Sequence, residues 1–282
     1  MTPRLRGTPQ RAAPHLRADH AGARIPWQLG GPAVIGATFL LIPLFALLAR
    51  VPWRDLPSLL TDPAIRDALR LSLLCASAAT VISVVVGVPL AWLLARSRRP
   101  GIGLVRALVT VPLVLPPVVG GVALLTAFGR QGIVGRWLDT ALGITLPFTT
   151  TGVIMAETFV AMPFLVLIVE GALRTSDRGL DEAAATLGAS RLRIALTVTL
   201  PLLGPSVLAG AVLTWARALG EFGATITFAG NFPGRTQTMP LAVYLAMESD
   251  PDAALALSFV LLLVCVLVLV TLRARWLPGG AR

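Results

Sequence analysis

Long apolar stretches separated by short polar loops make up most of this chain. Six stretches reach the length of about 20 mainly apolar residues that a helix needs to cross a bilayer. They cover residues 30–49, 69–95, 104–128, 152–173, 201–229 and 253–273. The pattern predicts an all-α integral membrane protein with six transmembrane helices. Residues 30–276 are expected to form one membrane domain, between an N-terminal tail at 1–29 and a C-terminal tail at 277–282.

The third apolar stretch is rich in residues that disturb helices. Prolines and glycines at membrane depth are tolerated only where protein or a water-filled cavity satisfies the freed backbone groups. The stretch is therefore expected to face protein or a pathway rather than lipid. The residues concerned are Pro112, Pro116, Pro117, Gly120 and Gly121.

Composition supports a membrane protein. The chain of 282 residues is 55% hydrophobic and 13% charged, whereas soluble domains carry about 25% charged residues. Its formal net charge is +10, and every basic residue is an arginine. Because the arginines lie beside apolar stretches, they favour membrane topology over nucleic-acid binding.

The arginines also predict the orientation. If the N-terminus is cytoplasmic, sixteen arginines lie in inner regions and seven in outer regions, while Arg217 remains inside the membrane. Positive charge favours the cytoplasmic side. Both termini and the loop at residues 176–200 are therefore expected in the cytoplasm.

Several chemistries are excluded by missing residues. A Walker A loop needs a lysine, and the chain has none, so it is not expected to hydrolyse ATP. His15 and His20 both lie in the N-terminal tail, which argues against a histidine metal site in the membrane. Cys75 and Cys265 are interpreted as buried apolar side chains rather than a disulfide. No catalytic residue, metal site or bound cofactor is predicted.

A short half-polar helix is predicted at residues 181–188, between two membrane stretches. Its first turn is acidic, which the helix dipole favours. Gly188 is a natural stop, Ser176 or Asp177 a start, and Ser190 a cap for a second helix. The apolar stripe consists of Leu180, Ala183, Ala184 and Leu187. Two interpretations remain open: a surface helix lying on headgroups, and a rigid lever on which a partner docks, with Glu182 supplying a charge.

The order Glu182-Ala183-Ala184, then Gly188, then Leu200-Pro201, resembles the EAA signature of binding-protein-dependent ABC importer permeases. Val198 stands where that family usually has isoleucine. The resemblance implies a type I ABC importer permease fold. It also implies a cytoplasmic coupling helix that contacts an ATPase subunit through Glu182, Ala183, Ala184, Leu187 and Gly188.

The same resemblance implies partners and a location. Two copies of the chain would form a homodimer in a bacterial inner (cytoplasmic) membrane. Two ABC ATP-binding subunits would hold the ATP and magnesium. A periplasmic or lipid-anchored binding protein would deliver the substrate, and no nucleic acid is involved.

The run from residue 217 to residue 244 resembles the molybdate permeases, which are kin to the sulfate and thiosulfate permeases. Its Gly-Glu-Phe-Gly-Ala part, at residues 220–224, is shared by both oxyanion groups. Its Ala-Gly-Asn-x-Pro-Gly part, at residues 229–234, is more similar to the molybdate branch. The resemblance implies molybdate as the substrate of an ATP-driven importer, with sulfate, thiosulfate or tungstate as the alternatives.

Polar residues in this region are the candidates for contact with an oxyanion. Backbone N–H groups and hydroxyls serve such an anion well. Glycine, asparagine and threonine are also turn formers, so helix capping is the alternative role of these residues. Within the membrane the candidates for pathway or packing are Arg217, Gly220, Glu221, Gly223, Thr225 and Glu157. In the outer loop they are Asn231, Gly234, Arg235, Thr236, Gln237 and Thr238.

Charges at membrane depth are costly, so they are expected to face the protein interior. Arg217 and Glu221 lie four residues apart and can pair on one helical face, either as a gate or as a packing pair. Glu157 is a further candidate partner for Arg217, and Glu170 is interpreted as an interfacial residue. A secondary transporter and a membrane-embedded enzyme are the rivals from other classes. The 181–188 motif speaks against the first, and the missing nucleophile and metal motifs speak against the second.

Overall fold

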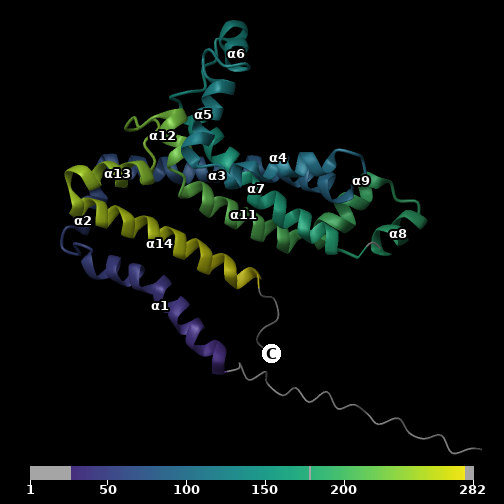
Figure 1. The fold of residues 1–282 in the computed structure, drawn as a ribbon, viewed down its shortest axis with the longest axis horizontal. Helices are drawn as coiled ribbons and strands as arrows, with labels where there is room; N and C mark the ends of the chain where they lie inside the picture. The colour runs from purple at the N-terminus through teal and green to yellow at the C-terminus, as the bar shows by residue number, and fades with distance from the viewer. Residues whose placement is uncertain (1–26, 178, 277–282) are drawn as a thin grey trace, which may run out of the picture. The chain divides into compact units, whose positions relative to one another are not determined.

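The computed structural model describes residues 27–177 and 179–276 (Figure 1). Most of the predicted N-terminal tail and all of the predicted C-terminal tail lie outside these residues. Every regular element in the described ranges is a helix, which confirms the all-α prediction. The elements are α1 (Trp27–Arg50), α2 (Leu56–Thr61), α3 (Pro63–Arg96), α4 (Ile102–Val114), α5 (Pro117–Phe128), α6 (Gly135–Leu142), α7 (Thr150–Thr175), α8 (Gly179–Thr186), α9 (Arg191–Ile194), the π-helix η1 (Ala195–Thr199), α10 (Leu200–Leu202), α11 (Gly204–Leu219), α12 (Gly223–Ala229), α13 (Met239–Ser249) and α14 (Pro251–Trp276).

The chain divides into two compact units, Met1–Ala49 and Arg50–Arg282. In the first unit, α1 contains the whole predicted first span as one continuous helix. Pro32 and Pro43 lie inside it. Ordered helix at both prolines shows that an apolar stretch of this length tolerates them without a break.

Helices α3, α7 and α11 form the centre of the second unit and run side by side (Figure 1). Small residues line part of the contact between them, and these let helix backbones approach closely in a membrane. A second part of the contact is filled by leucine and valine side chains. The buried small residues are Ala76, Ala79, Ala161 and Ala218, and the larger ones are Leu94, Leu165, Val166, Val169, Leu173 and Leu203.

The predicted third span is not one straight helix. Its two halves, α4 and α5, meet at an angle of 120°. Leu115 is extended between them, with ψ at 134°, as expected for a residue before proline. The consecutive prolines Pro116 and Pro117 then start α5. The third stretch therefore contains two helices joined at a sharp bend. Pro116 and Pro117 are exposed, whereas Gly120 and Gly121 are buried in the helix that packs on α12 and α7, so the expected contact with protein is made by the glycines.

The contact between α5 and α12 depends on Gly121. A Cβ atom on Gly121 would lie 2.5 Å from Thr227 Cβ and 3.0 Å from the carbonyl oxygen of Ala224. We therefore expect Gly121→Ala to destabilise the protein by about 1–3 kcal/mol, the usual cost of overpacking. Thermal unfolding of the purified chain in detergent measures this. Gly171→Ala is the control, because a Cβ there meets nothing within 4 Å. Equal unfolding midpoints for the two variants would contradict the expectation.

The predicted fifth span, 201–229, is also interrupted. A bend of 70° separates residues Arg191–Leu202 from α11. At its other end, α11 stops at Leu219, and α12 begins only at Gly223. Gly220 and Gly223 flank this break, and a Cβ on Gly223 would lie 2.7 Å from Pro117 Cβ. The missing side chain of Gly223 thus allows α12 to approach α5.

The remaining predicted spans lie inside helices. Residues 69–95 lie in α3, 152–173 in α7 and 253–273 in α14. In the described chain, four helices are long and apolar enough to cross a membrane, and six crossings result if each bent pair is one span. The structure therefore shows a helical protein with four to six candidate spans.

Glu170 is buried within the protein and pairs with two arginines, while its place at the membrane interface stays a prediction. Its Oε1 accepts from Arg106 Nε at 2.7 Å and lies 2.9 Å from Arg174 Nη2. Arg106 also donates to the carbonyl oxygen of Leu94 at 3.0 Å. One buried carboxylate thereby joins α4 to α7, while the arginine reaches the end of α3.

Candidate functional site

Helix α8 forms where the sequence predicts a short loop helix. Asp177 starts it, since Asp177 Oδ1 accepts from the backbone N–H of Gly179 at 2.8 Å. Gly188 ends it with φ at +81°, the left-handed conformation that glycine adopts at low cost. The N–H groups of Gly188 and Ala189 bond back to the carbonyls of Ala185 and Ala184 at 3.0 and 3.1 Å. Start and stop both agree with the prediction.

The second predicted helix follows at once. Ser190 Oγ accepts from the N–H of Arg193 at 3.4 Å at the start of α9. The chain then continues through η1 and α10 before the bend into α11. Short π-helical segments often occur at functional sites. Residues 191–202, called the α11 arm below, connect α8 to the central helix α11.

The candidate coupling residues lie on the outside of the second unit. Glu182, Ala183, Leu187 and Gly188 are exposed, whereas Ala184 is half-buried. Leu187 is 87% exposed. Within the described residues, Glu182 makes no ion pair. The surface of α8 therefore offers an acidic group, small side chains and an unburied leucine to a partner.

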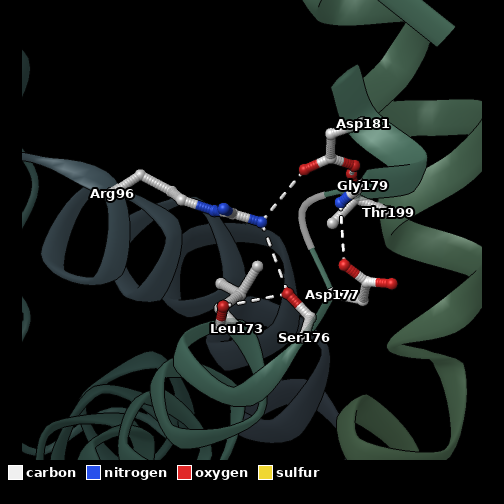
Figure 2. Close-up of polar contacts among 7 residues, drawn as sticks. All are labelled: Arg96, Leu173, Ser176, Asp177, Gly179, Asp181 and Thr199. Atoms are coloured by element: carbon white, nitrogen blue, oxygen red, sulfur yellow. Dashed lines mark hydrogen bonds and ion pairs between the residues drawn. The ribbon is translucent and has the colours of Figure 1, made fainter. Parts of the chain in front are cut away.

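Asp181 lies inward of this surface and connects three elements (Figure 2). Its Oδ2 accepts from Arg96 Nη2 at 3.1 Å, and its Oδ1 accepts from Thr199 Oγ1 at 2.8 Å. Arg96 also donates to Ser176 Oγ at 3.4 Å, and Ser176 in turn donates to the carbonyl oxygen of Leu173 at 2.9 Å. Sequence reasoning gave Asp181 only a helix-dipole role. The available signal was an opposite charge at Arg96, directly after the second predicted span.

The predicted pair of Arg217 and Glu221 is present. Arg217 Nη2 lies 2.8 Å from Glu221 Oε2, and the Glu221 side chain is 1% exposed. Glu221 Oε1 also accepts from the N–H of Ala224 at 2.8 Å. Glu221 lies just beyond the end of α11, so its carboxylate joins α11 to the start of α12. Gly220 and Gly223 stand on either side of this junction.

Glu157 is buried in α7 and is not the partner of Arg217. In the part of the chain that the structure describes, the ion pair of Arg217 is with Glu221. Glu157 is 1% exposed. Its Oε2 has no hydrogen-bond partner among the described residues. The hypothesis of a Glu157–Arg217 pair is therefore wrong.

The loop at residues 230–238, between α12 and α13, is a tight turn. Thr236 Oγ1 accepts from the N–H of Phe232 at 2.9 Å, and the Phe232 carbonyl accepts from the N–H groups of Arg235, Thr236 and Gln237 at 2.9 to 3.1 Å. Thr236, Gln237 and Thr238 are buried, and Gly234 and Arg235 are exposed. Thr236 thus acts as a turn former, the alternative that the sequence left open.

Three other candidates in this region have unused polar atoms. Thr225 Oγ1, Thr238 Oγ1 and Asn231 Oδ1 are buried and have no hydrogen-bond partner within the described ranges. Buried polar atoms normally find a partner in protein or water. A bond from these atoms to water or to a polar ligand would need the surrounding side chains to move, because less than 1 Å² of each atom is accessible.

Arg235 lines a hollow beside the loop at residues 230–238. The hollow has a volume of about 390 Å³ and contains a second arginine, Arg130, together with Thr145 and Phe148. The backbone of Arg235 is held in place, because its carbonyl oxygen accepts from Thr150 Oγ1 at 2.9 Å. Arg130 lies 3.6 Å from Asp139. The sequence identified Arg235 but not its neighbour, which follows α5 in a different loop.

Comparison with known proteins places the chain in a family. The family model described as "Binding-protein-dependent transport system inner membrane component" matches residues 87–277. The chain therefore belongs to this family of membrane transport permeases, and the resemblance of the Glu182 motif is confirmed at the level of the family.

Among its relatives are molybdenum permeases. The chain is 50% identical to the molybdenum transport system permease protein ModB of Mycobacterium tuberculosis over 239 residues, which are 85% of this chain and 90% of that protein. It is 44% identical to ModB of Escherichia coli over 191 residues, covering 68% and 83% of the two chains. The sulfate transport system permease protein CysT of Escherichia coli is 36% identical over 234 residues, covering 82% and 84%.

Solved structures share the fold. A bacterial ABC transporter involved in the import of the acidic polysaccharide alginate matches with a TM-score of 0.72 and 17% identity, covering 89% of this chain and 95% of that chain. The MetNI methionine ABC transporter in an inward-facing conformation matches with a TM-score of 0.56 and 22% identity, covering 75% and 95%. The chain has the helical fold of ABC importer permeases, as predicted from its sequence.

Proposed function

We propose that this chain is the membrane-spanning permease subunit of an ATP-driven molybdate importer. The observation that carries the proposal is the 50% identity to a molybdenum permease over 85% of this chain and 90% of that relative. The sulfate permease relative is matched over a similar share of the chain at 36% identity. The level of identity thus favours molybdate over sulfate.

In this proposal the energy comes from another subunit. The chain has no lysine for a Walker A loop, so ATP and magnesium belong to two ABC ATP-binding subunits. Helix α8 is the coupling helix on which they dock. Its exposed Glu182, Ala183, Leu187 and Gly188 support this role, because they are available to a partner. The small side chains allow a groove to close around the helix.

The proposed topology has six crossings, with the bent pairs counted as single spans. Both termini and α8 lie in the cytoplasm, on the side favoured by the arginines. Figure 1 shows α8 and α9 at one end of the second unit and α13 at the other. This separation agrees with α8 inside and the loop of Arg235 outside. A second copy completes the pathway, and a periplasmic or lipid-anchored molybdate-binding protein delivers the anion to the outer face.

Transport then follows from alternating access. Closure of the two ATPase subunits draws the coupling helices together, and the permease subunits rotate as rigid bodies between inward- and outward-facing states. A permeating ion must bind weakly enough to leave. Neutral hydroxyl and backbone donors suit such an ion, and the unpartnered hydroxyls of Thr225 and Thr238 are of this kind. Arg217, Glu221 and Glu157 either line the pathway or fix the packing around it.

Competition for uptake tests the substrate. We expect molybdate and tungstate to compete with labelled molybdate at least about tenfold better than sulfate does, a difference of about 1.4 kcal/mol in binding. The measurement uses proteoliposomes that contain the permease, its ATPase subunit and its binding protein. A preference for sulfate would assign the chain to the sulfate group instead.

The same preparation separates the rivals from other classes. Uptake should stop when internal ATP is removed while the ion gradients are kept. Uptake that continues would identify a secondary transporter. Chemical change of the anion without its movement would identify an enzyme.

A further inference from the structure

The helix that carries the exposed Glu182 is held to the rest of the second unit by few contacts. None of the residues in α8 is buried. Its closest helical neighbours are α9 and η1, which belong to the same arm. Apolar packing therefore does little to fix the angle of α8 relative to the central helices. A helix that transmits force needs another attachment.

Asp181 supplies that attachment. Its two carboxylate oxygens bind different elements: Oδ2 binds Arg96, in the last turn of α3, and Oδ1 binds Thr199, in η1 (Figure 2). The side chains of Arg96 and Asp181 are 19% and 23% exposed. Hydrogen bonds between charged groups are stronger than neutral ones, and limited exposure reduces their screening by water.

The attached elements lead directly to the core. Arg96 ends α3, which packs along α7 and α11. Thr199 lies in the arm that continues into α11. Arg96 also reaches Ser176, at the end of α7. The Asp181 carboxylate thus joins α8 to the end of α3 and to η1, and Arg96 extends this connection to the end of α7.

We propose that Asp181 is the positioning residue of the coupling helix: its bonds to Arg96 and Thr199 make α8, the end of α3 and the α11 arm move together. Two neighbouring residues thus have different roles. Asp181 faces inward and holds α8 in place, whereas Glu182 is exposed and available to a partner. The proposal rests on the proposed function for the identity of that partner. It adds the two elements to which the motion of α8 is transferred, the end of α3 and the α11 arm.

Asp181→Asn tests the proposal in the assembled complex. Asparagine has nearly the same size but loses the charge. We expect the complex to assemble and hydrolyse ATP, while the anions moved per ATP fall by about tenfold, the change that follows from losing one hydrogen bond to a charged group. Asp67→Asn is the matched control, because Asp67 is an exposed carboxylate in the first part of α3. An unchanged ratio of uptake to hydrolysis in Asp181→Asn would overturn the proposal.

The Thr199 bond is tested separately. Thr199→Val keeps the shape and removes the hydroxyl, whereas Thr199→Ser keeps the hydroxyl. We expect Val to lower the uptake per ATP by about tenfold, as for the loss of a hydrogen bond to a charged group, and Ser to restore it. Because the contacts share one carboxylate, Thr199→Val should add little to Asp181→Asn. Equal behaviour of Val and Ser, or fully additive losses, would contradict the attachment.

A distance measurement works even if the substrate assignment is wrong. Spin labels are placed at Ala185→Cys in α8 and Arg98→Cys after α3, with Cys75 and Cys265 replaced by alanine. We expect the distance distribution in the purified chain to broaden when Asp181→Asn is introduced. An unchanged distribution would refute the attachment itself. Broadening without molybdate uptake by the unsubstituted complex would refute only the proposed function.

Discussion

Replacing Gly188 with valine is expected to abolish most ATP-driven uptake while the protein remains inserted in the membrane. Gly188 has φ at +81°, and the left-handed conformation costs a residue with a Cβ about 1–2 kcal/mol, more when it is β-branched. The α8–α9 turn would therefore open and change the direction of α8. We expect uptake to fall more than about tenfold, since 1.4 kcal/mol corresponds to tenfold, and ATP hydrolysis by the complex to continue uncoupled. Both are measured in proteoliposomes.

Two further variants identify the cause. Gly188→Asn should retain more uptake than Gly188→Val, because asparagine tolerates the left-handed conformation. Gly101→Val is the matched control: Gly101 has φ at +91° in the loop before α4 and space for a side chain, but it is not part of α8. If Gly101→Val uncouples the complex as strongly as Gly188→Val does, general strain explains the loss and the role of α8 is wrong.

Charge reversal at the exposed face is a milder form of the same test. Glu182→Lys leaves the turn and the Asp181 bonds in place and changes only what the partner meets. We expect it to weaken the association with the ATPase subunit and to lower coupled uptake. Normal transport by Glu182→Lys would remove Glu182 from the docking surface.

The second large effect is expected at Arg217. Arg217→Ala leaves the carboxylate of Glu221 buried and without its ion-pair partner, and such a loss costs about 3–5 kcal/mol. The double variant Arg217→Ala with Glu221→Gln removes both charges, while Gln Oε1 can still accept from the N–H of Ala224. The double variant should therefore be more stable than Arg217→Ala. Thermal unfolding in detergent measures the difference.

Uptake by the same variants decides between a gate and a packing pair. If the pair only fixes packing, the double variant recovers both stability and uptake. If Arg217 lines the pathway, stability returns and uptake does not. Arg174→Ala is the control, since Glu170 keeps its bond to Arg106 at 2.7 Å. Additive losses from the two substitutions would show that Arg217 and Glu221 do not act as a pair.

Local features of the fold could be predicted from the sequence. The first, second, fourth and sixth apolar stretches lie inside α1, α3, α7 and α14, because length and apolar character are properties of the stretch itself. The start of α8 was predicted at Ser176 or Asp177 and its end at Gly188, because capping residues act within a few positions of the helix ends. The Arg217–Glu221 pair was predictable because its members are four residues apart.

Features that depend on distant contacts could not be predicted. Prolines indicated a disturbance in the third stretch, but the 120° bend depends on how α5 packs against α12. The contacts of Asp181 join residues 85 and 18 positions apart, which no local pattern encodes. Glu157 was assigned the wrong neighbour because a charge inside one helix does not show which helix faces it.

The bond between Arg106 and Glu170 has a consequence for biosynthesis. The two residues are 64 positions apart, and a ribosome adds about 5–20 residues per second. Arg106 therefore leaves the ribosome several seconds before the carboxylate that binds it. During this interval α4 lacks the contact that holds it to α7. The final position of α4 is thus set only after α7 has been synthesised.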